Sequence, residues 1–222
     1  MSLTLYYHPL ASHCWKVRIA LYENDTPFTG EIVNLGYKNG HANVCDLWPV
    51  GQVPMLRDEE RGRTVPETTI IIEYLDRHFP GSQQRLLPEN EDLRLDARLW
   101  DRFFDLHIHA PMQKIVSDRL RPQRQRDPWA VFEAETTLRM AYDVVERQMS
   151  TRTWAIGDAF SIADCAAFPA LFYADGVVPF GHAHPETAAY FDRLSQRPSV
   201  RRVLEEARPY FAEHWSQCRQ SR

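Results

Sequence analysis

Gly51-Gln52-Val53-Pro54-Met55-Leu56, followed shortly by Pro66-Glu67-Thr68, is the stretch that decides how the first part of this chain is expected to fold. Proline lacks the N–H that a strand interior needs, so Pro54 is expected at the first residue of a short apolar strand or on an edge. X-Pro bonds are the ones for which the cis form costs little. If Val53-Pro54 is cis, the N–H and C=O of Val53 turn outward and can pair with an extended ligand.

Glu67 and Thr68 are expected to open a helix, because an apolar run at residues 70–75 follows them. Thr suits a helix start, and the unpaired N–H groups of a first helical turn attract anions. The chain thus offers a backbone edge, an acidic side chain and an anion-holding helix start. Together these suit a small peptide with an amine and a carboxylate at one end. The simpler alternative is a turn, a strand and a capped helix without a ligand.

The rest of the N-terminal part reads as an α/β unit. Its order is predicted to be βαβ followed by ββα, with Ser12 as the N-cap of the first helix. A polar turn and a short helix at 41–48 precede the strand that Pro54 opens. The predicted strands are residues 3–7, 28–34, 55–57 and 64–65, and the predicted main helices are 13–23 and 68–79.

Beyond a Pro- and Gly-containing break at residues 80–84, the strand pattern disappears and helical periodicity takes over. A helix is expected at 91–110, and Pro111 should kink or end it. Asp164, placed after Ser161, completes a variant of the capping box. Helix starts are predicted at Asp127-Pro128, Ser161, His184-Pro185 and Arg208-Pro209.

These motifs, in this order, resemble the cytosolic glutathione transferases, and bacterial theta- or zeta-like members in particular. Residues 3–79 follow the family's N-terminal pattern, and Ser161 to Asp164 match the Ser/Thr-x-x-Asp box of its C-terminal half. The resemblance implies an α/β thioredoxin-like N-terminal domain at residues 1–80, a linker at 81–90 and an all-α C-terminal domain at 91–222. It also implies a homodimer and glutathione as co-substrate, without a metal.

The same resemblance implies a set of glutathione-binding residues. Glu67 and Thr68 match the positions that bind the γ-glutamyl amine and carboxylate. Val53, which precedes Pro54, matches the residue that pairs with the cysteinyl backbone. Gln52 lies where the glycyl carboxylate is often contacted. Lys38 and His41 would add positive charge there, or else are loop residues in solvent.

Three side chains compete to activate the thiol of glutathione, whose thiolate is the nucleophile. The family uses Tyr at the end of the first strand, or Ser or Cys at the start of the first helix. Here the usual Ser or Cys position falls on Ala11, and Ser12 lies one residue later. Tyr7 matches the tyrosine position, and Cys14 is the third candidate. Without a role in catalysis, Ser12 would be a plain N-cap, Tyr7 a packed strand residue and Cys14 a buried, inert thiol.

The implied activity is attack of the glutathione thiolate on a small hydrophobic electrophile that the sequence does not identify. A glutathione-dependent isomerase and a disulfide reductase are the alternative enzymes, and the reductase would need a reactive cysteine. Ala11 keeps a third alternative open, a glutathione-binding protein of the same fold without turnover. The electrophile would lie against an aromatic helix face of the C-terminal half. The alternative is that these side chains only pack in the hydrophobic core. The face consists of Trp100, Phe103, Phe104, His107 and Met112.

Composition fits these expectations. The net charge of −4 argues against nucleic acid or an acidic membrane as the main partner. There is no apolar run of the ~20 residues that a membrane span needs, and no secretory signal is recognised. The four cysteines are scattered, which favours reduced thiols in the cytoplasm. His pairs spaced by two residues do not suit a metal site.

Overall fold

The computed structural model of the chain describes residues 3–33, 42–81 and 85–220. By their internal contacts the residues divide into two compact units. Unit 1 combines Met1–Arg85 with Pro198–Arg222, and unit 2 is the continuous segment Leu86–Arg197. The two units are described separately below.

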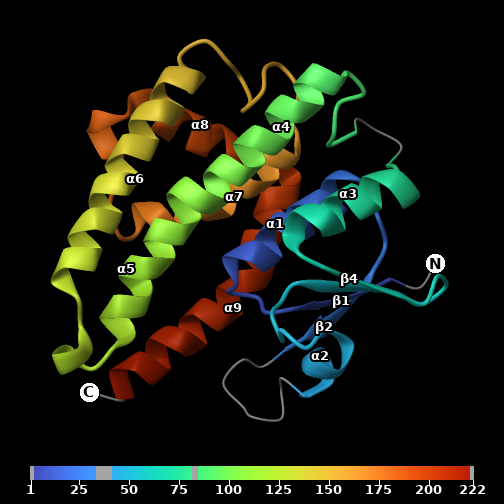
Figure 1. The fold of residues 1–222 in the computed structure, drawn as a ribbon, viewed down its shortest axis with the longest axis horizontal. Helices are drawn as coiled ribbons and strands as arrows, with labels where there is room; N and C mark the ends of the chain where they lie inside the picture. Colours follow the sequence, from blue (N-terminus) through green and yellow to red (C-terminus); the bar gives the residue numbers. More distant parts are fainter. Residues whose placement is uncertain (1–2, 34–41, 82–84, 221–222) are drawn as a thin grey trace. The chain divides into compact units, whose positions relative to one another are not determined.

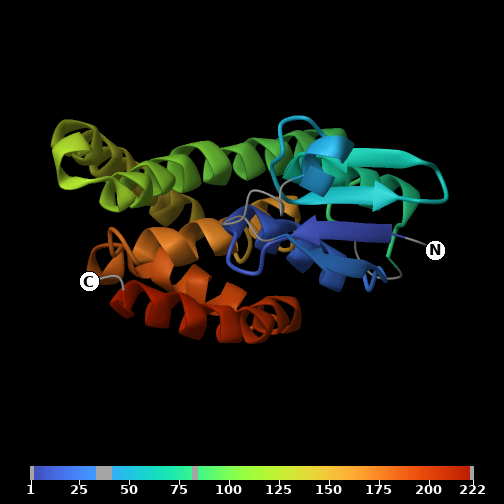
Figure 2. The same cartoon turned by 90° about the horizontal axis from the view of Figure 1, so that it is seen from below.

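Unit 1 contains a four-stranded sheet in the order β2-β1-β3-β4 (Figure 1). β1 pairs in parallel with β2 and antiparallel with β3, and β3 pairs antiparallel with β4. The β3–β4 hairpin beside β1 can be followed in Figure 2. The strands are β1 (Leu3–Tyr7), β2 (Thr29–Ile32), β3 (Met55–Asp58) and β4 (Arg63–Pro66). The predicted mixed α/β unit is therefore confirmed.

Helices cover both faces of this sheet (Figure 1). The buried trio Leu5, Leu56 and Val65 lies on one face, since these residues are paired across β1, β3 and β4. On this side α1 (Ser12–Glu23) packs against α3 (Thr68–His78), which contacts β3 and β4. The helix α2 (Ala42–Leu47) belongs to the other face. The apolar cluster on that face consists of Tyr6, Val33, Val44, Leu47, Val53 and Met55.

The last helix, α9 (Pro198–Gln220), joins unit 1 rather than unit 2. It packs against α1 and buries Val200, Val203 and Ala207. The expected all-α domain at residues 91–222 included this segment. Helical periodicity predicts that a segment is a helix, but it does not show which surface the helix packs on. The expected helix start at Arg208-Pro209 is wrong: Pro209 lies inside α9. The ring centroids of Trp15 in α1 and Phe211 in α9 lie 6.1 Å apart, so the contact with α1 extends beyond Pro209.

Unit 2 is helical. Apart from one isolated bridge between Trp154 and Gly157, its described residues contain no strand, as predicted. Its elements are α4 (Glu91–Phe103), the π-helix η1 (Phe104–His109), α5 (Ala110–Leu120), the 3₁₀ turn η2 (Gln123–Gln125), α6 (Pro128–Met149), α7 (Ile162–Asp175), the 3₁₀ turn η3 (Gly181–Ala183) and α8 (Pro185–Ser195). The predicted starts after Asp127 and His184 are confirmed.

Pro111 neither ends the helix nor interrupts its run. α4, η1 and α5 follow one another without a break, and the π-helical segment lies directly before Pro111. A proline ring clashes with the carbonyl four residues earlier, here that of His107, and His107 lies within the π-helical segment. Among the described residues, no helix is long and apolar enough to cross a membrane.

The capping box at the start of α7 is confirmed. Ser161 is the N-cap, and its N–H donates to Asp164 Oδ2 over 2.8 Å. The Ser161 hydroxyl donates to the same oxygen over 2.9 Å. Asp164 Oδ1 accepts the N–H of Ala155 over 2.9 Å and the Tyr190 hydroxyl over 2.6 Å. Burial raises the pKa of the Asp164 carboxyl, and these hydrogen bonds oppose that rise.

Candidate functional site

The sheet register brings the sequence-predicted residues to one end of unit 1. Met55 pairs with Tyr6 on one side and with Pro66 on the other. Because antiparallel partners run in opposite directions, the next row in this direction holds Tyr7, Pro54 and Glu67. The end of β1, the entry to β3 and the exit from β4 therefore share one edge of the sheet.

Val53 and Pro54 form the central part of this edge. The Val53-Pro54 bond is cis, as predicted. Val53 is half-buried on the α2 side, whereas Gln52 is exposed. The N–H and C=O of Val53 make no backbone hydrogen bond with another described residue. Both groups are therefore available to an extended ligand, and the Gln52 amide is open to solvent beside them.

Glu67 and Thr68 form the second part. The helix α3 begins at Thr68, as predicted, and Glu67 is its N-cap. The carbonyl of Glu67 accepts the N–H of Ile71 over 2.8 Å. Its exposed carboxylate makes no hydrogen bond or ion pair with a described residue, and its backbone φ is 68°. Such a φ is strained for a non-glycine residue and costs about 1–3 kcal/mol. Strain of this kind is often kept where a side chain serves a ligand.

Ser12 lies at the start of α1, but not as its cap. The N-cap is Ala11, which has no side chain that can cap, and Ser12 is the first helical residue. The predicted N-cap role of Ser12 is therefore wrong by one residue, since Ala11 already closes the loop by donating its N–H to His8 over 3.1 Å. The half-buried Ser12 hydroxyl stays at the N-terminus of α1, where the helix dipole favours an anion.

Tyr7 is turned away from Glu67. A Cβ placed on Gly30 would lie 2.9 Å from Tyr7 Cε1 and 3.6 Å from the hydroxyl oxygen, so the ring covers that glycine. Gly30 belongs to β2, on the opposite side of β1 from β3. The guanidinium carbon of Arg18 lies 4.8 Å from the ring centroid. Burial raises the pKa of the Tyr7 hydroxyl, and the Arg18 charge opposes that rise. The geometry is that of a packed strand residue.

Cys14 is buried in α1 and accepts the N–H of His8 at 3.4 Å from its sulfur. Burial raises the pKa of its thiol to about 12. A thiol with such a pKa is protonated at neutral pH and reacts poorly.

Lys38 and His41, the two remaining predicted residues, lie outside the described part of the chain. Among the residues that are described, no three His, Cys, Asp or Glu side chains gather as a metal site requires.

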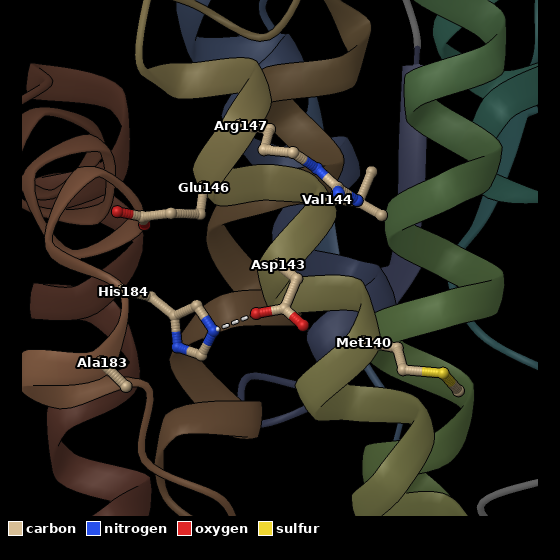
Figure 3. Close-up of a pocket in the computed structure, with 7 residues that line it drawn as sticks. All are labelled: Met140, Asp143, Val144, Glu146, Arg147, Ala183 and His184. Carbon is tan, nitrogen blue, oxygen red and sulfur yellow. Dashed lines mark hydrogen bonds and ion pairs between the residues drawn. The ribbon is translucent and has the colours of Figure 1, made fainter.

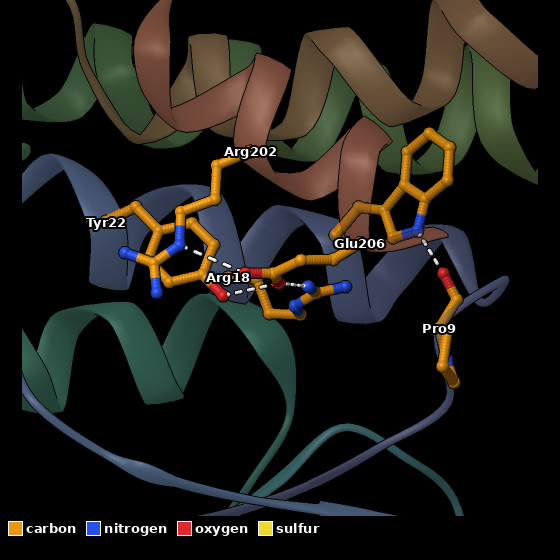
Figure 4. A network of polar contacts seen from close by, with 6 residues as sticks. Pro9, Arg18, Tyr22, Arg202 and Glu206 are labelled. Carbon is orange, nitrogen blue, oxygen red and sulfur yellow. Dashed lines mark hydrogen bonds and ion pairs between the residues drawn. The ribbon is translucent and has the colours of Figure 1, made fainter. Parts of the chain in front are cut away.

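Two buried cations on α1 were missed by the sequence reasoning. Lys16 is 1% exposed, and its Nζ donates to Thr69 Oγ1 over 3.2 Å. Arg18 pairs with Glu206 of α9, whose carboxylate also accepts the Tyr22 hydroxyl over 2.7 Å (Figure 4). The signal was present: both residues stand inside the otherwise apolar run at residues 14–21.

Unit 2 holds the aromatic residues that were considered for a second substrate. Phe104 and Met112 are core residues. The rings of Trp100 and Phe103 lie 4.9 Å apart, and those of Phe103 and His107 lie 5.2 Å apart. These three side chains are only partly buried or exposed, so they form a surface aromatic cluster.

An open pocket of about 490 Å³ lies elsewhere in unit 2, between α6 and the start of α8 (Figure 3). His184 Nε2 lies 3.0 Å from Asp143 Oδ1 there. Glu146 accepts the N–H groups of Glu186 and Thr187, so it serves as a cap for α8. None of the sequence-predicted residues lines this pocket, and its acidic groups are engaged in holding α6 to α8.

Comparison with known proteins gives matches along most of the chain. The family model described as "Glutathione S-transferase, N-terminal domain" matches residues 5–83. The model described as "Glutathione S-transferase, C-terminal domain" matches residues 105–198.

Similar individual proteins cover nearly the whole chain. Glutathione S-transferase GstB of Escherichia coli is 24% identical over 91% of this chain and 97% of its own length. Dichloromethane dehalogenase of Methylorubrum extorquens is 29% identical over 92% of this chain and 75% of its own length. A crystal structure of a Methylobacillus flagellatus glutathione S-transferase with GSH bound has a TM-score of 0.83 at 21% identity, and the match covers 90% of this chain and 98% of that one. The structural likeness confirms the predicted fold.

Proposed function

The chain belongs to the glutathione S-transferase family, and from this premise we propose that it binds glutathione at the edge formed by Val53, Glu67 and Ser12 and transfers the thiolate to a small hydrophobic electrophile. The observation that carries the proposal is the sheet register. It brings the entry to β3 and the exit from β4 into one row beyond Met55.

Each part of glutathione has a suitable partner at this edge. The exposed Glu67 carboxylate receives the γ-glutamyl ammonium, and the first-turn N–H groups of α3 at Thr68 receive the carboxylate beside it. The N–H and C=O of Val53, held next to Pro54, pair with the cysteinyl backbone. The Gln52 amide serves the glycyl carboxylate, and Lys38 and His41 add positive charge there.

Ser12 is the proposed thiol-activating residue. Its hydroxyl donates to the sulfur while the N-terminus of α1 adds a favourable dipole, and both stabilise the thiolate. Tyr7 remains the second candidate, but its hydroxyl lies over Gly30. Cys14, with a raised pKa, is a poor reagent for disulfide exchange, and this disfavours the reductase alternative.

The functional assembly is proposed to be a homodimer in the cytoplasm. Several leucines on α4 and η1 stay exposed within unit 2: Leu93, Leu95, Leu99 and Leu106. Leu95 and Leu99 are 66% and 61% exposed and stand one helical turn apart. A second copy of the chain would remove this apolar surface from water. Sedimentation analysis should then give twice the chain mass, and a strictly monomeric protein would contradict the proposal.

Thiolate absorbance and turnover together test the function. Wild-type protein should bind glutathione in calorimetry and lower the thiol pKa of the bound ligand. It should then conjugate a chloronitrobenzene. Binding without a lowered pKa would indicate a glutathione-binding protein without turnover. Turnover of a mixed disulfide or a cis-trans isomerisation alone would indicate one of the other enzyme classes.

A further inference from the structure

Lys16 is a buried cation in the middle of α1. Only 1% of it is exposed. Removing an ammonium from water is unfavourable unless other groups compensate for the lost hydration. Its Nζ donates to Thr69 Oγ1 over 3.2 Å, and this contact links α1 to α3. Lys16 therefore ties the start of α3 to the middle of α1.

The position of the charge agrees with the proposed site. Lys16 follows Ser12 by one helical turn, so both side chains lie on the same face of α1. Thr69 is the second residue of α3, directly after Thr68. The ammonium therefore lies beside the first turn of α3, whose N–H groups have no partners within the helix.

We propose that Lys16 is a positioning residue of the glutathione site, which holds the first turn of α3 against α1 and supplies a fixed positive charge for the γ-glutamyl carboxylate. The inference rests on the proposed function, because it assigns a role within that site. A cation and a helix N-terminus act in the same direction on a carboxylate. The same cation repels the ligand's ammonium group, which Glu67 receives. Lys16 therefore favours binding through the carboxylate alone.

Two variants and two ligands test this role. Lys16→Met removes the charge at nearly constant length, and Thr69→Val removes the acceptor oxygen at constant shape. Calorimetry should compare glutathione with γ-aminobutyryl-cysteinyl-glycine, an analogue that keeps the amine and lacks the carboxylate. Lys16→Met should weaken glutathione roughly tenfold, or about 1.4 kcal/mol. The affinity for the analogue should not fall and should rise slightly, because the variant removes the cation that repels the analogue's ammonium. Thr69→Val should produce a smaller loss, again for glutathione only.

Lys114→Met provides the matched control, because it removes an exposed ammonium of unit 2 that lies 3.8 Å from Glu133. It should change neither affinity. Equal losses for both ligands in Lys16→Met would mean that Lys16 only supports the fold, and unchanged glutathione affinity would also overturn the inference. If Lys16→Met does not fold, the ratio of the two affinities in Thr69→Val decides in the same way. Wild-type protein that binds neither ligand would refute the proposed function itself.

Discussion

Two acidic residues at helix starts, Glu67 before α3 and Asp164 in the first turn of α7, have opposite environments. Asp164 is fully buried and accepts hydrogen bonds from Ala155, Ser161 and Tyr190. Glu67 is exposed, has a φ of 68° and has no side-chain partner among the described residues. The Asp164 carboxylate is hydrogen-bonded within the protein, whereas the Glu67 carboxylate is accessible to a ligand.

The contrast shows how similar motifs separate into folding and binding roles. A buried carboxylate must be fully hydrogen-bonded, and removing it leaves several donors unpaired. The exposed Glu67 carboxylate makes no hydrogen bond or ion pair with a described residue that would stabilise the fold. Changes at Asp164 should therefore act on stability, and changes at Glu67 on ligand affinity.

The largest effect is expected for Asp164→Ala. The variant leaves the N–H groups of Ala155 and Ser161 and the hydroxyl of Tyr190 without their acceptor, at about 1–3 kcal/mol for each buried group. Thermal and urea unfolding should show a loss of several kcal/mol. Asp158→Ala, a change to an exposed acid of the preceding turn, is the control and should change little. Equal stability of the two variants would break the comparison.

Glu67→Ala should act on affinity instead. The variant leaves the ligand ammonium without its carboxylate, and charge-assisted contacts of this kind contribute about 1.5–3 kcal/mol. Calorimetry should show glutathione binding weakened at least tenfold, while the melting temperature does not fall. Glu59→Ala, at the far end of the β3–β4 hairpin, is the matched acidic control. Unchanged affinity of Glu67→Ala would place the ligand elsewhere.

Ser12→Ala sharpens the assignment of the thiol-activating group. Loss of the hydroxyl donor should raise the thiol pKa of bound glutathione by about one unit, which corresponds to about 1.4 kcal/mol. Tyr7→Phe should leave that pKa in place. Ultraviolet thiolate absorbance titrated against pH measures both. The reverse outcome would make Tyr7 the donor.

The smallest effect has the opposite sign. Glu67→Gly relieves the strain of the positive φ, since glycine adopts such backbone easily. The free energy of unfolding should rise by roughly 1 kcal/mol, while glutathione binding is weakened as in Glu67→Ala. A variant that is less stable than wild type would show that the Glu67 side chain also supports the fold.

Much of unit 1 could be predicted because its signals are local. Pro54 fixed the entry to β3, and the acid-Thr pair before an apolar run fixed the start of α3. The strand order β2-β1-β3-β4 and the register were not predicted, because they depend on pairing between strands that are distant in the sequence. The predicted N-cap was wrong by one residue, because alanine has no side chain that can cap a helix and Ser12 was therefore preferred. Ala11 is nevertheless the N-cap, and its N–H donates to the carbonyl of His8 in the preceding loop.

Features that depend on distant contacts could not be predicted. The sequence around Pro209 looks like a helix start, and only the packing of α9 on α1 shows that the helix continues. Lys16 and Arg18 stand in an apolar run that signals burial, but the sequence does not show which groups they pair with. Two of these partners, Thr69 and Glu206, are far away in the sequence.

The division of unit 1 between the two ends of the chain has a consequence for biosynthesis. A ribosome delivers Leu86–Arg197 as one continuous piece, whereas unit 1 lacks α9 until translation reaches Pro198 and beyond. Unit 2 therefore has its full set of residues first. Until α9 has been synthesised, Arg18 lacks the Glu206 carboxylate that neutralises it. The surface of α1 that α9 covers also remains exposed until then. Unit 1 can therefore be completed only after all residues of unit 2 have been synthesised.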